Sequence, residues 1–190
     1  MIRPGSVFYN PHNREQITFL HTHASSNGAY LRIAAVVGAG GEQAGGALRH
    51  FHPLQEEKFI VHSGLLCMYV KGGKKIFKAG DTVVIPAGVP HRWRNCSYTE
   101  PLHFTYEIAP AMQWEMVIET LWALAQKGAV RENGSASFLQ LAVTLDHFRE
   151  HFYFAGLPVP LQRVIFRLGA VIGRKLGLKP HHKYRGVDGL

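Results

Sequence analysis

The side chains best suited to chemistry in this chain are three histidines and one glutamate, His50, His52, Glu57 and His91. His50 and His52 are two residues apart, so on a strand both imidazoles would lie on the same face. Glu57 follows after a proline-containing bend, and His91 opens a separate strand-like run. Three imidazoles and one carboxylate suit one divalent first-row transition metal ion, and this ligand set does not choose among Fe, Mn, Co, Ni, Cu and Zn.

Four protein ligands on an octahedral ion would leave two positions open for O₂, water or an oxygen donor of a substrate. Glu57 is the only carboxylate of the set, so it is also the candidate base toward a bound substrate. Glu56 is the rival carboxylate. The period of two along the next strand groups Glu57 with Phe59 and Val61 and places His62 on the other face, which favours Glu57 as the ligand.

The elements that would position these residues are short β-type runs separated by Gly and Pro. They cover residues 7–9, 17–21, 30–37, 59–70, 74–78, 82–85, 91–95 and 102–108. Many short strands with regular turn signals predict a sandwich or barrel rather than βαβ units.

After Pro110 the apolar residues recur at helical spacing, which predicts helices over 112–127, 137–154 and 161–176. The predicted organisation is a strand-rich unit over 1–110, a helical extension over 111–178 and a loose basic tail over 179–190. Hydrophobic residues make up 46% of the chain and charged residues 18%, which is typical of a globular protein.

Two spaced patterns resemble the motifs of the cupin family. The first family motif is Gly, five residues, His-x-His, three or four residues, Glu, six residues and Gly. Its counterparts here are His50, His52, Glu57 and Gly64, with Ala44 in place of the leading Gly and Gly45 and Gly46 just after it.

The second family motif is Gly, five residues, Pro-x-Gly, two residues, His, three residues and Asn. Every position matches, at Gly80, Pro86, Gly88, His91 and Asn95. The resemblance covers roughly residues 30–108. Cupins are jelly-roll barrels, so it implies an all-β jelly-roll barrel with an α-helical C-terminal extension, and metal binding by His50, His52, Glu57 and His91 inside the barrel.

The assumed strand phases place Phe59, Val61, Trp93 and Tyr106 around the predicted metal. Such an aromatic cup prefers a flat or apolar small molecule with an oxygen donor over a sugar. The leading hypothesis is therefore a metal-dependent dioxygenase. One alternative is a non-catalytic metal- and ligand-binding sensor whose helices contact a partner or a membrane surface. A second is a sugar isomerase or epimerase, which would need polar and basic groups inside the cup.

The net charge of +8 is concentrated in residues 156–190, where seven basic side chains and one acidic give a net +6. An apolar stripe on the third predicted helix lies opposite Arg163, Arg167 and Arg174. We expect this stripe to pack on the barrel or the other helices; a membrane surface is the less favoured reading. No nucleic-acid-binding motif accompanies the charge, so DNA and RNA are not expected partners.

Other features predict little chemistry. The sequence His147-Phe-Arg-Glu150-His151 matches the H-x-x-E-H pattern of some zinc proteases, but no third ligand accompanies it. The His21/His23 pair lacks a carboxylate at useful spacing, and the His181/His182 pair lies in the predicted loose tail. Cys67 and Cys96 do not by themselves predict a disulfide.

No apolar run reaches roughly 18 residues and the N-terminus has no apolar signal stretch, so we expect a cytoplasmic protein. Exposed edge strands favour a homodimer.

Overall fold

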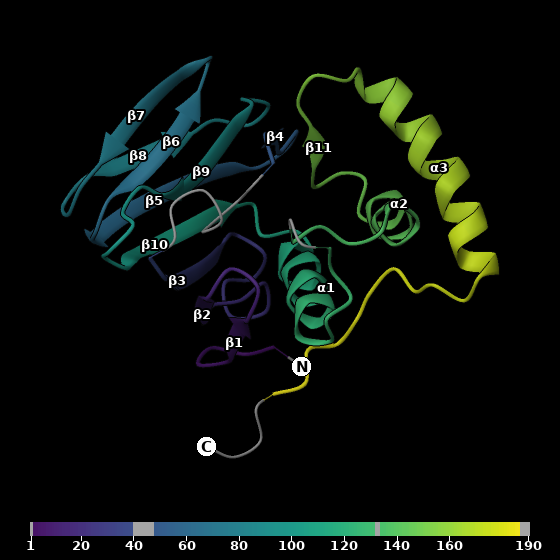
Figure 1. The fold of residues 1–190 in the computed structure, drawn as a ribbon, viewed down its shortest axis with the longest axis horizontal. Coiled ribbons are helices and arrows are strands. Elements are labelled where there is room, and N and C mark those ends of the chain that lie inside the picture. Colours follow the sequence, from purple (N-terminus) through teal and green to yellow (C-terminus); the bar gives the residue numbers. More distant parts are fainter. Residues whose placement is uncertain (1, 40–47, 132–133, 187–190) are drawn as a thin grey trace.

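The computed structural model describes residues 2–39, 48–131 and 134–186, and in these it contains two antiparallel sheets and three helices (Figure 1). The larger sheet has the order β1 (Val7–Asn10), β2 (Glu15–His21), β3 (Leu31–Val37), β10 (Leu102–Ala109), β5 (Glu56–Ser63) and β8 (Thr82–Ile85). The smaller sheet has the order β11 (Tyr153–Phe154), β4 (His50–Phe51), β9 (His91–Asn95), β6 (Leu66–Val70) and β7 (Gly73–Phe77). The positions of Ala44, Gly45 and Gly46 in the first motif lie outside the described residues.

The two sheets form a jelly-roll-like arrangement, in which strands far apart in sequence become neighbours. β10 lies between β3 and β5, and β9 lies between β4 and β6. The prediction of a closed barrel is corrected, because no hydrogen-bonded ladder among the described strands joins one sheet to the other. A shared apolar core holds them together instead, to which every described strand except β4 and β11 contributes inward residues.

The predicted strand over residues 59–70 is two strands, β5 and β6, and the reason is Gly64. This residue has a φ of +80°, and a Cβ at this position would collide with the carbonyl oxygen of Pro101. Only glycine adopts that backbone at little cost in so tight a place. The chain therefore turns at Gly64, and β5 and β6 enter different sheets.

The helices are α1 (Trp114–Gln126), α2 (Phe138–His147) and α3 (Val159–Lys175). The prediction of one helix over 137–154 is wrong in its second half. α2 begins after Ser137, whose Oγ accepts the Gln140 N–H, but it ends at His147, and Tyr153–Phe154 is a strand that pairs with β4. Among the described residues, no helix is both long and apolar enough to cross a membrane.

The hydrophobic core combines both sheets with the helical part. Phe19, Leu31 and Phe104 of the sheets lie in one buried cluster with Val117 of α1 and Phe148. α2 and α3 share a second, smaller cluster of Ala142, Leu145 and Phe166. The last described segment returns to the first strands, where Tyr184 stacks on Phe8 with ring centroids 4.2 Å apart. The three-part division of the chain stays a prediction, and these contacts cross each of its boundaries.

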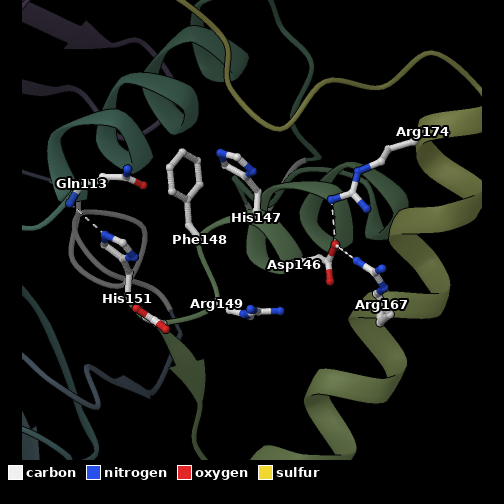
Figure 2. A pocket seen from close by; sticks show the side chains of 9 residues that line it. Gln113, Asp146, His147, Phe148, Arg149, His151, Arg167 and Arg174 are labelled. Carbon is white, nitrogen blue, oxygen red and sulfur yellow. Dashed lines mark hydrogen bonds and ion pairs between the residues drawn. The ribbon is translucent and has the colours of Figure 1, made fainter.

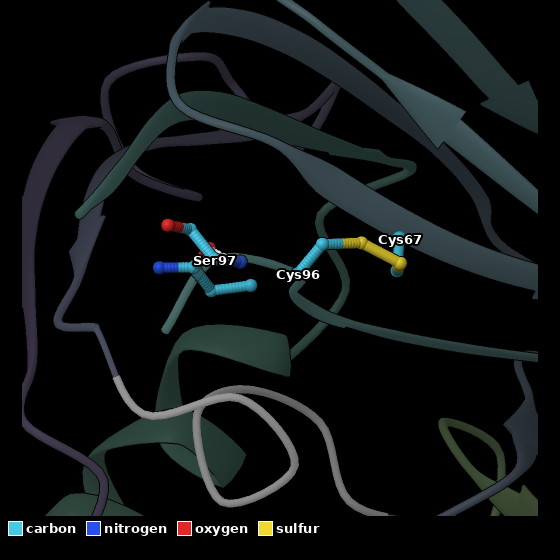
Figure 3. The surroundings of a disulfide bond; sticks show 4 residues. Cys67, Cys96 and Ser97 are labelled. Atoms are coloured by element: carbon cyan, nitrogen blue, oxygen red, sulfur yellow. Dashed lines mark hydrogen bonds between the residues drawn. A yellow bond between two sulfur atoms is a disulfide. The ribbon is translucent and has the colours of Figure 1, made fainter. Parts of the chain in front are cut away.

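Cys67 of β6 and Cys96, just after β9, form a disulfide with their Cα atoms 5.5 Å apart (Figure 3). The two strands are adjacent, since Cys67 lies opposite Arg94 in the ladder and the Cys96 N–H donates to the Leu65 carbonyl at 2.9 Å. Sequence spacing contains no such signal, because the pairing depends on the register of β6 with β9.

Candidate metal centre

The four predicted ligands lie together in the structure. Each of His50, His52, Glu57 and His91 offers a ligand atom, and these atoms all lie within 4.8 Å of one another. His50 and His91 face each other across the β4–β9 pair, His52 follows β4, and Glu57 comes from β5 in the opposite sheet. All four residues are buried. The centre therefore spans the space between the two sheets.

Backbone carbonyls fix the orientation of all three imidazoles. Nδ1 of His50 lies 2.9 Å from the Leu48 oxygen, and Nδ1 of His91 lies 3.0 Å from the Val89 oxygen. Nδ1 of His52 lies 2.5 Å from the oxygen of His151, 99 residues later in the chain. A carbonyl oxygen only accepts, so each Nδ1 must carry a proton, and the lone pair of a neutral ring is then on Nε2.

The side-chain atoms that point into the centre are suited to binding a cation. Nε2 of His91 lies 2.6 Å from Oε2 of Glu57, and Nε2 of His52 lies 3.5 Å from Oε1. When the rings are neutral, the Nε2 atoms of His52 and His91 and the carboxylate oxygens of Glu57 all accept hydrogen bonds. Among the described residues, no hydrogen-bond donor reaches Nε2 of His52, Nε2 of His91 or Oε2 of Glu57, and all three atoms are buried. Buried acceptors without donors are costly. A divalent metal ion bound by these atoms would satisfy all of them.

The pKa shifts of His50 and Glu57 agree with this donor set, whereas that of His91 indicates a proton shared with Glu57 when no metal is bound. Burial lowers the pKa of His50 to about 3, and the neighbouring His52 and His91 add to the shift, so this ring is neutral near pH 7. Burial alone would raise the pKa of Glu57, but the surrounding imidazoles outweigh it and lower this pKa to about 2. Burial opposes a positive charge on His91, yet the bond to Glu57 raises its pKa, so without a metal this pair can hold a proton.

The low pKa of Glu57 bears on its two predicted roles. A carboxylate that stays ionised is ready to bind a cation. The same pKa of about 2 makes it a weak proton acceptor near neutral pH, because a good general base has a pKa near the working pH. Catalysis by Glu57 as a base stays a prediction, and the electrostatics favour the ligand role.

Two aromatic residues from the helical part of the chain lie against the rings of the candidate ligands. Phe152 stacks on His50 with centroids 4.7 Å apart, and Trp114 meets the ring of His52 edge-on at 4.6 Å. Trp114 Nε1 donates to the Tyr106 hydroxyl at 2.9 Å. The sequence prediction missed Phe152, Trp114 and the His151 carbonyl. No local sequence signal identifies these groups, because their contacts with the candidate ligands join residues far apart in the sequence. Such contacts depend on how the helical part of the chain folds back onto the sheets.

The predicted pocket residues belong to, or pack against, the hydrophobic core of the sheets. Phe59 and Val61 are buried in the core, and Trp93 and Tyr106 are partly buried against it. The Phe59 ring lies 5.9 Å from that of Tyr106 and 6.1 Å from that of Trp93. Burial, helped by the charge of Glu57, raises the pKa of Tyr106 well above its usual value, so its hydroxyl keeps its proton. Their role in binding a substrate stays a prediction.

The other histidine motifs do not form comparable clusters within the described residues. His147 is the last residue of α2, so His147 and His151 do not share a helical face as the H-x-x-E-H pattern requires. Both line an open pocket of about 380 Å³ with Asp146, Arg167 and Arg174 (Figure 2). His151 Nε2 accepts the Gln113 N–H at 2.9 Å, and His181 pairs with Glu119.

Comparison with known proteins agrees with the motifs. Residues 36–108 match the family model described as "Cupin domain". No curated protein matches the sequence significantly. Among solved structures, an RmlC-like cupin from Shewanella frigidimarina NCIMB 400 has a TM-score of 0.48 and 18% identity, covering 58% of this chain and 88% of that one. KdgF from Halomonas sp. has a TM-score of 0.45 and 16% identity, covering 60% and 89%.

A cupin-superfamily protein from Silicibacter pomeroyi DSS-3, described as a sugar phosphate isomerase, has a TM-score of 0.43 and 22% identity. The match covers 50% of this chain and 59% of that protein, so this chain spans less than two thirds of its length. The family match falls on the segment that carries three of the strands around the centre and all four candidate ligands. Residues 36–108 of this chain are therefore similar to a cupin domain.

Proposed function

We propose that this protein is a metal-dependent enzyme of the dioxygenase type, acting on a small flat or apolar molecule that carries an oxygen donor. The observation that supports it is the buried centre of three imidazoles and one carboxylate, with every Nδ1 bonded to a backbone carbonyl and the lone pairs directed inward. Such preorganisation serves a bound metal with open coordination positions.

A divalent transition metal held by His50, His52, Glu57 and His91 would supply Lewis acidity and, for a redox-active ion, a means of activating O₂. Phe152 and Trp114 lie against the ligand rings and limit the access of water. Tyr106 keeps its proton and can donate a hydrogen bond to a substrate oxygen. These aromatic neighbours favour a planar or apolar substrate over a hydroxylated one.

The test is oxygen consumption by the full-length protein after removal of metal and reloading with Fe(II), Mn(II), Co(II), Ni(II) or Cu(II). Flavonols, diketones and aromatic diols form the substrate panel. We expect uptake of O₂ with at least one metal and substrate class, and loss of uptake in His50→Ala. His62→Ala is the matched control, because His62 is an exposed imidazole on the outer face of β5. Metal-loaded protein that consumes no O₂ across the panel would contradict the proposal.

A second candidate is a sensor module that binds a metal and ligand without turnover. β11, in the connection between α2 and α3, pairs directly with β4, where His50 lies. A ligand at the centre would therefore contact a strand that is coupled to the helices. Thermal stabilisation by a panel compound that yields no product would favour this candidate over the enzyme.

A further inference from the structure

The outer face of α3 is apolar and exposed, contrary to the prediction that its apolar stripe packs on the barrel or on the other helices. The buried side of α3 consists of Gln162, Phe166, Gly169, Ala170 and Gly173. The opposite side presents aliphatic residues with exposed fractions of 44% to 63%, namely Leu161, Val164, Leu168, Val171 and Ile172. Leu157 and Leu176 extend this apolar stripe at the two ends of the helix.

Two glycines explain why this side, and not the apolar stripe, packs on α2. A Cβ at Gly169 would lie 2.8 Å from Cβ of Ala142, and one at Gly173 would lie 2.6 Å from Cγ2 of Val143. The backbone of α3 therefore approaches α2 closely along its small residues. Figure 1 shows α3 at the edge of the molecule, with α2 between it and α1. The apolar stripe faces away from the described body of the protein.

The surroundings of the stripe are positively charged. Residues 156–186 contain no Asp or Glu and seven basic side chains, Arg163, Arg167, Arg174, Lys175, Lys179, Lys183 and Arg185. Arg167 and Arg174 reach Asp146 of α2, at 3.3 Å and 2.6 Å, as Figure 2 shows. Lys175, at the end of α3, and Lys179, just beyond it, are exposed. An apolar surface with a basic border needs a partner that is both apolar and anionic.

We propose that α3 binds the surface of an anionic lipid bilayer, with its aliphatic stripe in the boundary between headgroups and acyl chains and the basic residues among the phosphates. An amphipathic helix with a basic border is suited to that position. A second copy of the chain is a poorer partner, because pairing two such faces would bring basic residues together without an acidic side chain on α3. Protein interfaces also favour aromatic anchors, and the stripe has none.

The first experiment is co-sedimentation of the full-length protein with vesicles. One set consists of phosphatidylcholine alone, and the other has phosphatidylglycerol as a quarter of the lipid. We expect binding to the anionic vesicles that weakens at high salt, because the basic residues are exposed and screened by ions. Absence of binding to the anionic set, or equal binding to both sets, overturns the proposal.

Substitutions then test the stripe itself. Leu168→Glu places a charge at its centre, and binding should fall by at least about tenfold, because burial of one leucine is lost. Ile76→Glu is the matched control: Ile76 of β7 is 56% exposed, comparable with 63% for Leu168, and lies outside the stripe. Its binding should equal that of the wild type. If Leu168→Glu binds the anionic vesicles as strongly as the wild type does, the proposal is wrong.

A second pair of variants tests the charge without touching the apolar residues. Lys175→Gln with Lys179→Gln should weaken binding to anionic vesicles, while Lys74→Gln with Lys75→Gln, two exposed lysines of β7, should not. Sedimentation velocity without lipid completes the design. A wild-type dimer that Leu168→Glu dissociates, with no vesicle binding, would show that the stripe binds a second copy and that the proposal is wrong.

Discussion

The proximity of the four candidate ligands was predictable from the sequence, and the orientation of their rings was not. The resemblance to the two cupin motifs implied that His50, His52, Glu57 and His91 lie together, and the structure brings them together. The period of two in β5 correctly predicted that His62 faces outward. The sequence could not show that Nδ1 of His52 bonds to the carbonyl of His151. A backbone carbonyl has no residue type, so nothing in the sequence marks the one that a distant imidazole selects.

Glu15 is a second buried carboxylate, outside the metal centre, and it predicts a pH dependence of stability. It lies on the inward face of β2, where burial raises its pKa to about 7 although the Asn13 amide, which donates to it at 2.8 Å, opposes the shift. The unfolded chain has the ordinary value near 4.5. The stabilising contribution of the protonated carboxyl is therefore full below pH 4.5 and is lost as the pH rises through 7.

Glu15→Gln removes this dependence. The free energy of unfolding of the variant, relative to the wild type, should rise between pH 5 and pH 8, as measured by urea denaturation at both pH values. Glu100→Gln, at an exposed carboxylate, is the control and should show no such rise. If the free energy of unfolding of Glu15→Gln differs from that of the wild type by the same amount at both pH values, the predicted pH dependence is wrong.

His151 and Phe152, in the connection between α2 and α3, contact the candidate ligands, although the sequence predicts that the second helix continues to residue 154. The spacing of Phe148 and Phe152 fits a helical face, and this local pattern is misleading, because pairing of Tyr153 with Phe51 overrides it. Two-residue strands such as β4 and β11 contain too few positions for an alternating pattern. The apolar stripe of α3 was predicted, but its exposure was the less favoured alternative, since periodicity identifies an apolar face but not what covers it.

Phe152→Ala tests whether this connection supports the centre. Loss of the ring that stacks on His50 should loosen the imidazole and weaken metal affinity by about tenfold, as for other residues that orient ligands. Competition with a chromophoric chelator measures the affinity. Phe138→Ala, at the start of α2, removes a ring remote from the ligands and should leave the affinity unchanged. Equal affinities of wild type and Phe152→Ala would argue against the supporting role.

The disulfide between β6 and the end of β9 should stabilise the smaller sheet. It closes a loop across a sequence separation of 29, for which the chain-entropy model gives about 3–4 kcal/mol. We expect a reducing agent to lower the free energy of unfolding of the wild type, but not that of the variant with both Cys67→Ala and Cys96→Ala. Titration of thiols in the denatured, unreduced protein is the check, and two free thiols per chain would show that the bond is absent.

The whole molecule is built so that the helical part completes the sheets. Phe148 and Trp114 lie in the core of the sheets, and the ring of Tyr184, near the C-terminus, stacks on that of Phe8 in the first strand. The jelly-roll-like class was predictable from the strand spacing and the two motifs. The open relation of the sheets was not, because closure depends on hydrogen bonding between particular edges. The homodimer stays a prediction, which sedimentation equilibrium of the full chain would test.

The central claim is that residues from both sheets converge on one metal ion, and elemental analysis tests it most directly. Purified wild-type protein, His50→Ala and the control His62→Ala would be compared after the same exposure to divalent transition metals, with circular dichroism to establish that each is folded. We expect about one metal ion per chain in the wild type and in His62→Ala, and a strong loss in His50→Ala. Undiminished metal content in folded His50→Ala would contradict the assignment of the centre.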